Sequence, residues 1–230
     1  MGRALFVVFI ALLASSPSLP QGGKDKDDAG ITIDKDKRLL KIDAKIAPRK
    51  LEHLNEVYPL EVVACWPHPK GKKAHETLVI VDAKPSAVHK ALVDFGVKPG
   101  TPIMGQSKEK PQGPEVKLWL EFPGPDGETK KVSIDRTMVD KANGKQFPKS
   151  VKWRFTGSVM TKPDPTKDEK AYGADLSGTL IAIFPVTDQT VIQGELFFDD
   201  QTFLRLEVNT KLLPKENTPV KLVIELTATK

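Results

Sequence analysis

The sequence predicts an α+β domain that is mostly β, built as an antiparallel sandwich or curled sheet with one packed helix at residues 85–95. Three observations support this fold class. About ten short apolar segments succeed one another with turn residues between them. A single segment carries a clear helical spacing, and the loops are rich in proline, with 19 prolines in 230 residues. Strands that follow one another without helices between them usually pair antiparallel.

The N-terminal part begins with a predicted strand pair. Residues 31–34 and 38–47 alternate apolar and polar side chains, and residues 34–37 form the turn between them. The run 60–66, "LEVVACW", predicts a buried strand. A further strand is expected at 75–83, "HETLVIVDA", with His75 and Glu76 at its start, where alternation would point them to opposite faces.

Residues 85–95 carry the clearest helix signal in the chain. Proline suits the first turn of a helix and glycine the position just past its end, and Pro85 and Gly96 stand at these positions. The apolar residues between them follow i, i+3, i+4, i+7 spacing, at Val88, Ala91, Leu92 and Phe95. This stripe predicts a helix that packs on the sheet.

The C-terminal half reads as further strands. Residues 115–122 alternate strictly, and "PGPDGE" at 123–128 predicts the turn of a hairpin with 129–135. A short helical turn is expected within 138–150, and the continuously apolar run 178–186 predicts a central strand. Other strands are expected at residues 151–160, 191–198, 203–214 and 220–229.

The first residues have the layout of a secretory signal peptide. Arg3 precedes an apolar stretch at residues 4–14, followed by small residues and prolines. That stretch is too short to span a bilayer, which needs ~20 residues. We therefore expect a signal peptide at 1–22, a disordered linker at 23–30 and a single globular domain at 31–230. The protein should be exported to the periplasm or the extracellular space, without a transmembrane segment in its mature form.

Composition excludes several function classes. The net charge of +5 comes from 35 basic and 30 acidic residues that are interspersed, without the basic stripes and interleaved aromatics of nucleic-acid binders. Cys65 is the only cysteine, so the chain can form neither an internal disulfide nor its own iron–sulfur cluster. No phosphate-binding glycine motif is present, so no nucleotide binding and no cofactor is predicted.

A zinc site is one hypothesis for the histidines. His68, His75 and His89 lie within 22 positions of one another. The metalloprotease pattern HE-x-x-H is incomplete, however, because Val79 stands where its second histidine belongs. The alternative is that His75 makes structural hydrogen bonds and that His68, between two prolines, is exposed.

Nucleophilic catalysis is a second hypothesis. Ser158 and Ser177 are the candidate nucleophiles, although neither lies in a G-x-S-x-G elbow. His75 and Asp175 could complete a triad in space, with Glu76 as a further acid or base. The alternative is that both serines, each beside a glycine, are strand-end or bulge residues.

The loop at residues 68–75, "HPKGKKAH", is a candidate anion site. It carries Lys70, Lys72 and Lys73 beside two histidines. Such a basic loop could bind phosphate or an acidic glycan, and the alternative is a solvated hairpin loop.

The stretch at residues 71–100 resembles the core of the YdjY-domain family of exported bacterial proteins, with a planctomycete-type source. It shares a Gly-Lys loop, His-Glu-[Ser/Thr]-Leu, Lys-Pro-Ser, an Ala-Leu helix and Gly-x-x-Pro-Gly. These elements stand at residues 71–73, 75–78, 84–86, 91–92 and 96–100. A second block matches at 153–158 and 172–183, so the resemblance spans residues 60–190.

The resemblance implies no particular reaction, and the ferredoxin-like label of some members cannot apply to a chain with one cysteine. It does draw attention to His75, Glu76, Asp175 and residues 155–158 as one polar cluster at adjacent strand ends. The sequence favours an exported binding or structural module of the bacterial envelope, with an unidentified envelope component as its partner. The alternative is a metal-dependent or serine-type hydrolase centred on His75.

Overall fold

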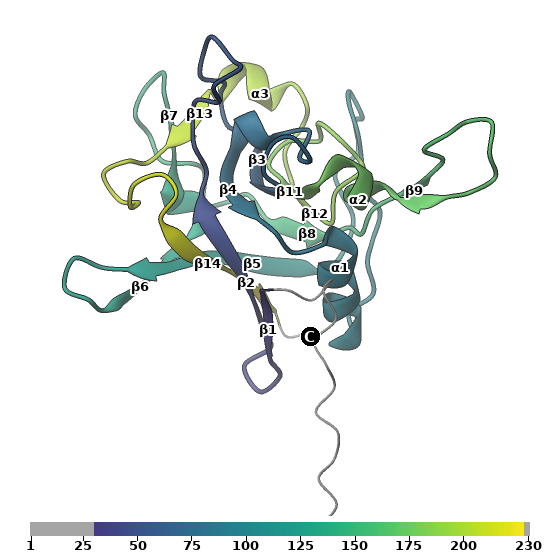
Figure 1. Cartoon of the computed structure of the whole chain (residues 1–230), viewed down its shortest axis with the longest axis horizontal. Coiled ribbons are helices and arrows are strands. Elements are labelled where there is room, and N and C mark those ends of the chain that lie inside the picture. Colours follow the sequence, from purple (N-terminus) through teal and green to yellow (C-terminus); the bar gives the residue numbers. More distant parts are fainter. Residues whose placement is uncertain (1–29, 228–230) are drawn as a thin grey trace, which may run out of the picture.

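Alternating and continuously apolar runs form the strands of the computed structural model, which describes residues 30–227 (Figure 1). Within this range, ten strands form one sheet, and the pairs β9–β10 and β7–β13 form two small ones. The strands are β1 (Ile31–Asp34), β2 (Leu39–Ile46), β3 (Val62–Cys65), β4 (Thr77–Val81), β5 (Glu115–Pro123), β6 (Thr129–Ser133), β7 (Met138–Asp140), β8 (Trp153–Phe155), β9 (Met160–Thr161), β10 (Ala171–Tyr172), β11 (Thr179–Ala182), β12 (Ile192–Gly194), β13 (Leu206–Val208) and β14 (Pro219–Leu226).

The predicted helix is confirmed as α1 (Pro85–Asp94), with Phe95 as its C-terminal cap. Gly96 follows with a φ of 83°, a conformation that glycine adopts without strain. The structure also contains two short helices, α2 (Gly173–Ser177) and α3 (Asp200–Phe203), and the 3₁₀ turns η2 (Ala74–Glu76) and η3 (Ile134–Thr137). These elements are too short to show a helical period in the sequence, and none was predicted at these positions.

The main sheet closes on itself. Its strands follow the order β2–β14–β5–β8–β12–β11–β3–β4, and β4 pairs back with β2. β1 adds to the first half of β2, and β6 adds to β5 in the hairpin that projects from the body (Figure 1). The mostly β, α+β fold class is therefore confirmed, and the architecture is a barrel-like closed sheet where a sandwich or curled sheet was expected.

Two strand pairs are parallel, which corrects the prediction of an antiparallel sheet. β3 pairs parallel with β4, and β11 pairs parallel with β12. In both cases an irregular connection, at residues 66–76 and 183–191, returns the chain to the start of the next strand. The connection between two parallel strands usually contains an α-helix. Neither of these connections contains one, so the sequence gave no indication of parallel pairing.

The core is aliphatic, as the composition indicated. Inward-facing leucines, isoleucines and valines of the closed sheet are fully buried, and the α1 side chains Val88 and Leu92 join the same cluster. Ala91 is buried with them and Phe95 is partly buried, so the predicted stripe does dock the helix. Figure 1 shows α1 beside the closed sheet, and the β9–β10 arm projecting from the opposite side to the β5–β6 hairpin.

The short helical turn expected within 138–150 follows strand β7 at residues 141–143, where the N–H of Gly144 donates to the carbonyl of Asp140 at 2.8 Å. The 3₁₀ turn η3 precedes the same strand. One smaller expectation needs correction. The strand expected at 203–214 shrinks to β13, because α3 ends at Phe203 and turns follow Val208. The predicted signal peptide, and the predicted linker apart from Gly30, lie outside the described residues. Among residues 30–227, no helix combines the length and apolar character that crossing a membrane requires.

Candidate functional site

The loop before β4 is fixed by close packing around Gly71. A Cβ at this glycine would lie 2.0 Å from the backbone oxygen of Trp66, so only glycine fits. The backbone N–H of Lys72 donates to the carbonyl of Ser177 at 2.9 Å. The loop then ends in η2, and β4 starts only at Thr77. His75 and Glu76 therefore precede the strand, and the expectation that they begin it on opposite faces is wrong.

Glu61 and Glu76 are neighbours because β3 and β4 run parallel. Val62 is in register with Thr77, and the backbone N–H of Glu61 donates to the carbonyl of Glu76 at 3.0 Å. The residues that precede the two strands thus share one end of the sheet. Two carboxylates at this end need a cation nearby.

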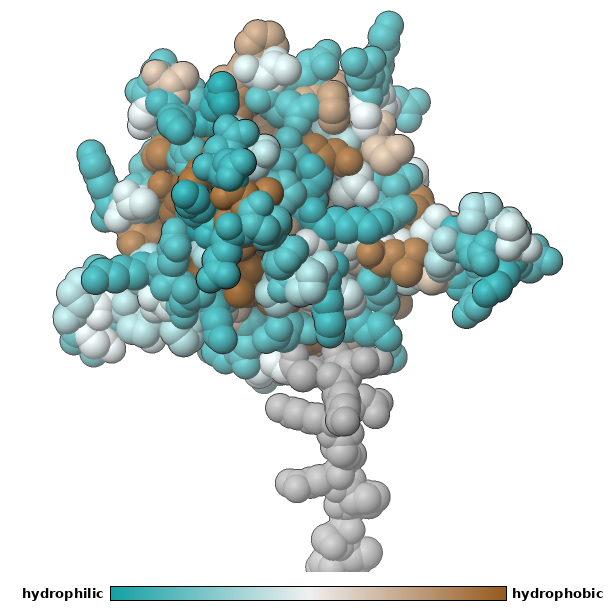
Figure 2. Space-filling model, turned by 45° about the horizontal axis from the view of Figure 1, so that its top comes forward, coloured by the Kyte–Doolittle hydropathy of each residue, from teal (hydrophilic) through white to brown (hydrophobic). Residues whose placement is uncertain are grey.

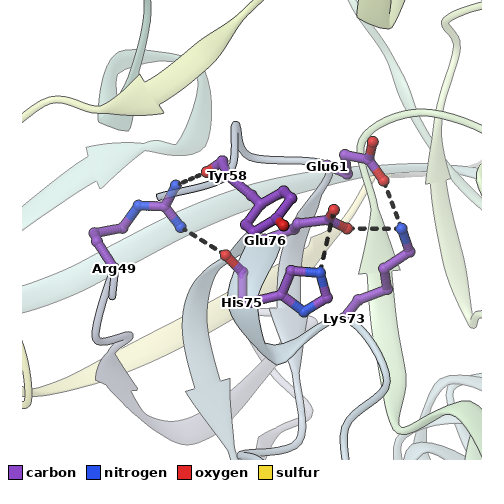
Figure 3. Close-up of polar contacts among 6 residues, drawn as sticks. All are labelled: Arg49, Tyr58, Glu61, Lys73, His75 and Glu76. Atoms are coloured by element: carbon purple, nitrogen blue, oxygen red, sulfur yellow. Dashed lines mark hydrogen bonds and ion pairs between the residues drawn. The ribbon is translucent and has the colours of Figure 1, made fainter. Parts of the chain in front are cut away.

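Lys73 supplies that cation (Figure 3). Its Nζ lies 2.7 Å from Oε2 of Glu61 and 2.6 Å from Oε2 of Glu76. Glu76 is only 8% exposed. We call Glu61, Lys73, His75 and Glu76 the Lys73 cluster. Sequence reasoning assigned Lys73 to a possible anion site, whereas the structure uses its charge within the cluster; Lys70 and Lys72 are exposed.

The imidazole of His75 meets the other oxygen of Glu76. Its Nε2 lies 3.3 Å from Oε1, and the ring of Tyr58 stands edge-on at a centroid distance of 5.2 Å. Arg49 donates to the backbone carbonyls of Tyr58 and His75, which fastens the preceding loop to η2 (Figure 3). The histidine is thus oriented from three sides.

The charges of the cluster shift its pKa values in different directions. Burial and the neighbouring Glu76 raise the pKa of Glu61, although the Lys73 hydrogen bond opposes this. Burial acts to lower the pKa of Lys73, but its two carboxylate partners outweigh burial and raise it. Burial and then the Lys73 charge lower the pKa of His75, so this imidazole is neutral at pH 7 and donates from Nε2 to Glu76.

Ser158 belongs to a different group of contacts. Its Oγ accepts from the backbone N–H of Ala174 at 2.9 Å, and its own N–H donates to the hydroxyl of Tyr172 at 3.1 Å. That hydroxyl lies 2.6 Å from Nδ1 of His89. The hydroxyl group thus bonds both Ser158 and His89, and the tautomer of His89 decides which group donates in the second bond. Burial lowers the pKa of His89 and raises that of Tyr172.

Asp175 caps the helix α1. Its Oδ1 accepts from the backbone N–H of Ser86, in the first helical turn, at 2.9 Å. Ser177, the other candidate nucleophile, donates to the carbonyl of Gln189 at 2.6 Å. Within residues 30–227, no hydrogen bond joins His75 to Ser158 or Asp175. The expected single polar cluster is therefore divided in two, and its members do not form a triad.

The histidines proposed as metal ligands lie in separate surroundings. His68 is exposed and stacks on His53 with ring centroids 4.2 Å apart, whereas His75 contacts Glu76 and His89 contacts Tyr172. In the part of the chain that the structure describes, no group of three or more His, Cys, Asp or Glu side chains could hold a metal ion.

A groove of about 800 Å³ lies on the outer face of β2, β14 and β5. Its apolar lining includes Ile80, Phe122 and Val220, and charged side chains stand around it. Figure 2 shows the general character of the surface on one side, where hydrophilic side chains predominate and apolar ones are visible between them. Neither the Lys73 cluster nor Ser158 or Asp175 lines this groove. We call it the β2–β14 groove.

Comparisons with known proteins give one match. The family model described as "YdjY domain" matches residues 31–225, nearly the whole range that the structure describes. No curated protein matches the chain, and no solved structure matches it.

Proposed function

The chain belongs to the YdjY-domain family, and we propose that it is an exported module that binds a component of the bacterial envelope without converting it. One observation carries this proposal: the candidate catalytic residues do not lie in the largest described groove. They are bonded into the fold in two groups, and none of them lines the β2–β14 groove.

Each candidate catalytic residue already has a structural task. Asp175 caps α1, Ser158 bonds backbone N–H and C=O groups, and Glu76 neutralises Lys73. A catalytic base must reach the proton that it removes, and a nucleophile needs a base beside it. Among the described residues, Ser158 has no hydrogen bond to a histidine.

The β2–β14 groove has the properties of a binding site. Its volume of about 800 Å³ lies in the range of ligand pockets, and its lining combines apolar and charged side chains. Lys41 pairs with Glu121 and Lys221 with Asp43 along its wall. Lys45 is exposed on the same face and has no ion-pair partner within residues 30–227, so its charge is available to a ligand.

The alternative function is a hydrolase centred on His75, either zinc-dependent or serine-type. One observation favours it: Glu61 has a raised pKa and lies with Glu76 and His75 at one end of the sheet. A carboxyl group with a raised pKa near an imidazole is the composition of an acid–base pair. The two functions differ in whether a product is released.

Co-sedimentation tests the proposed binding function. The mature chain is mixed with isolated peptidoglycan sacculi or with polygalacturonate, and the bound protein and the released sugars or peptides are both measured. We expect binding without product, retained in His75→Gln and Ser158→Ala, and we expect binding to sacculi to be weakened in Lys45→Glu. Absence of binding to both polymers would contradict the proposal. Product formation that His75→Gln abolishes, or about one zinc per chain that His75→Gln and His89→Gln remove, would establish the hydrolase.

Export has its own test. N-terminal sequencing of the protein made in bacteria should find a chain that starts between residues 15 and 24. A mature protein that retains residues 1–14 would contradict the export proposal.

A further inference from the structure

A second groove, of about 350 Å³, lies where β5 changes its neighbour. Along one edge, β5 pairs with β8 at Glu115 and Val116 and with β6 from Trp119 onward. Residues 117–118, between these two partners, have no strand of the described range paired with them on that edge. Trp119 and Asp135 both line the groove. We call it the Trp119 groove.

Two buried polar atoms of this groove have no hydrogen-bond partner in the described structure. They are the indole Nε1 of Trp119 and the carboxylate Oδ2 of Asp135. Buried polar atoms are paired in nearly all folded proteins, and an unpaired one indicates a missing water, ion or ligand group. Here one atom is a donor and the other an acceptor, so a ligand that bonds to both has to accept and to donate.

Alternation along β5 explains why the tryptophan is available. Trp119 stands between Leu118 and Leu120, which are buried in the core, so its side chain points outward. A tryptophan on the outer face of a strand does not contribute to the core of the closed sheet. The ammonium group of Lys131 lies 4.8 Å from the centroid of its ring, so a ligand would contact the indole surface that Lys131 leaves open.

The rim of the groove is mainly positive. Lys117, Lys149 and Lys152 line it, against the carboxylates of Glu115 and Asp135. Lys152 lies 3.6 Å from Glu115, whereas Lys117 and Lys149 have no ion-pair partner within residues 30–227. Unpaired ammonium groups around a groove favour a negatively charged ligand.

We propose that the Trp119 groove binds an acidic sugar, a uronate unit of an envelope polysaccharide. A sugar hydroxyl both accepts and donates, so adjacent hydroxyls can take the indole N–H of Trp119 and give a proton to Asp135. The apolar face of a pyranose can lie against the indole, and the sugar carboxylate can reach Lys117 or Lys149. This inference rests on the proposed binding function and names one ligand class at a groove separate from the β2–β14 groove.

Titration of the mature chain with trigalacturonate tests the proposal, with a neutral trisaccharide and inorganic phosphate as controls. We expect trigalacturonate to bind, the neutral sugar to bind about tenfold more weakly, and added salt to reduce the difference. Trp119→Phe keeps an aromatic ring but removes the N–H, and Asp135→Leu removes the acceptor; each should weaken binding about tenfold. Lys117→Gln should also weaken it, whereas Lys211→Gln, an exposed lysine outside both grooves, should not.

Several results would overturn the proposal. Unchanged affinity in folded Trp119→Phe and Lys117→Gln would exclude the groove, and equal affinity for inorganic phosphate would reduce it to a general anion site. Trigalacturonate binding that only Lys45→Glu removes would assign the sugar to the β2–β14 groove. If the chain sediments with sacculi but does not bind trigalacturonate, this inference alone fails; if it sediments with neither polymer, the proposed function fails as well.

Discussion

Replacing Lys73 by methionine tests whether the Lys73 cluster stabilises the fold. Methionine keeps an unbranched apolar stem but removes the ammonium group that lies 2.7 Å from Glu61 and 2.6 Å from Glu76. The variant leaves two carboxylates side by side at the start of the parallel strands β3 and β4. We expect it to fold with lower stability at neutral pH.

The magnitude follows from the two bonds that are lost. A hydrogen bond to a charged group contributes ~1.5–3 kcal/mol, and breaking a buried ion pair costs ~3–5 kcal/mol. The Lys73 side chain is 28% exposed, so water partly replaces what is lost and the lower ends apply. We therefore expect Lys73→Met to reduce the free energy of unfolding by ~3 kcal/mol at pH 7.5.

The sign of the pH dependence separates charge from packing. Without Lys73, the pKa of Glu61 should lie further above its unfolded value, because burial and the charge of Glu76 then act unopposed. A carboxyl with a raised folded pKa takes up a proton on folding, so the deficit should be largest above that pKa and should shrink as pH falls towards 4.5. Lost packing would give a deficit that does not change with pH.

Urea unfolding followed by tryptophan fluorescence measures these effects. A second change, Glu76→Gln, should destabilise the wild type but partly rescue Lys73→Met by ~1 kcal/mol, because it removes the uncompensated charge. A deficit below ~0.5 kcal/mol at pH 7.5, or one of the same size at pH 5, would refute the structural role given to Lys73.

Three further predictions concern α1 and its surroundings. Leu92 is fully buried, so Leu92→Ala should lower the free energy of unfolding by ~2–5 kcal/mol, and a change near zero would mean that the helix is not docked. Asp175→Ala should cost ~1 kcal/mol by removing the acceptor for Ser86, with Asp175→Asn costing less, and equal stability of both with the wild type would contradict the cap. Burial lowers the pKa of His89, so its neutral form is favoured in the folded state. The stability that neutral His89 contributes is therefore present above pH ~6.5, the unfolded pKa, and is lost as pH falls through the folded pKa. His89→Asn keeps an acceptor for Tyr172 and should flatten the fall in stability between pH 7 and 5; an unchanged slope would exclude His89 as its source.

Local patterns in the sequence were sufficient for most elements of the fold. The helix at 85–95, the hairpin around residues 123–128 and the central strand after Gly178 all follow from spacing and turn residues. Pairing across the sheet was harder to derive, because it depends on connections whose direction no local pattern records. The closure of β4 onto β2 and the two parallel pairs are of this kind.

The sequence identified the polar residues of the candidate site but not which of them contact one another. His75, Glu76, Ser158 and Asp175 were recognisable as polar residues near strand ends, yet their partners come from distant parts of the chain. Asp175 bonds a residue 89 positions away, a distance at which sequence spacing carries no information. The alternation of residues 115–122 places Trp119 on one face of a strand. Only the neighbouring loop with Asp135 makes it part of a groove.

The parallel pairing of β3 and β4 also bears on whether the Lys73 cluster is catalytic. Once these strands run side by side in register, the residues that precede them, Glu61 and Glu76, must share one end of the sheet. Two such carboxylates require a cation, and the nearest residue of the connecting loop that can supply it is Lys73, three positions before Glu76. The parallel pairing of β3 and β4 is therefore sufficient to explain why Glu61, Lys73, His75 and Glu76 lie close together. A catalytic role would need an additional observation, such as a substrate-sized groove that reaches Glu61, and the β2–β14 and Trp119 grooves both open elsewhere.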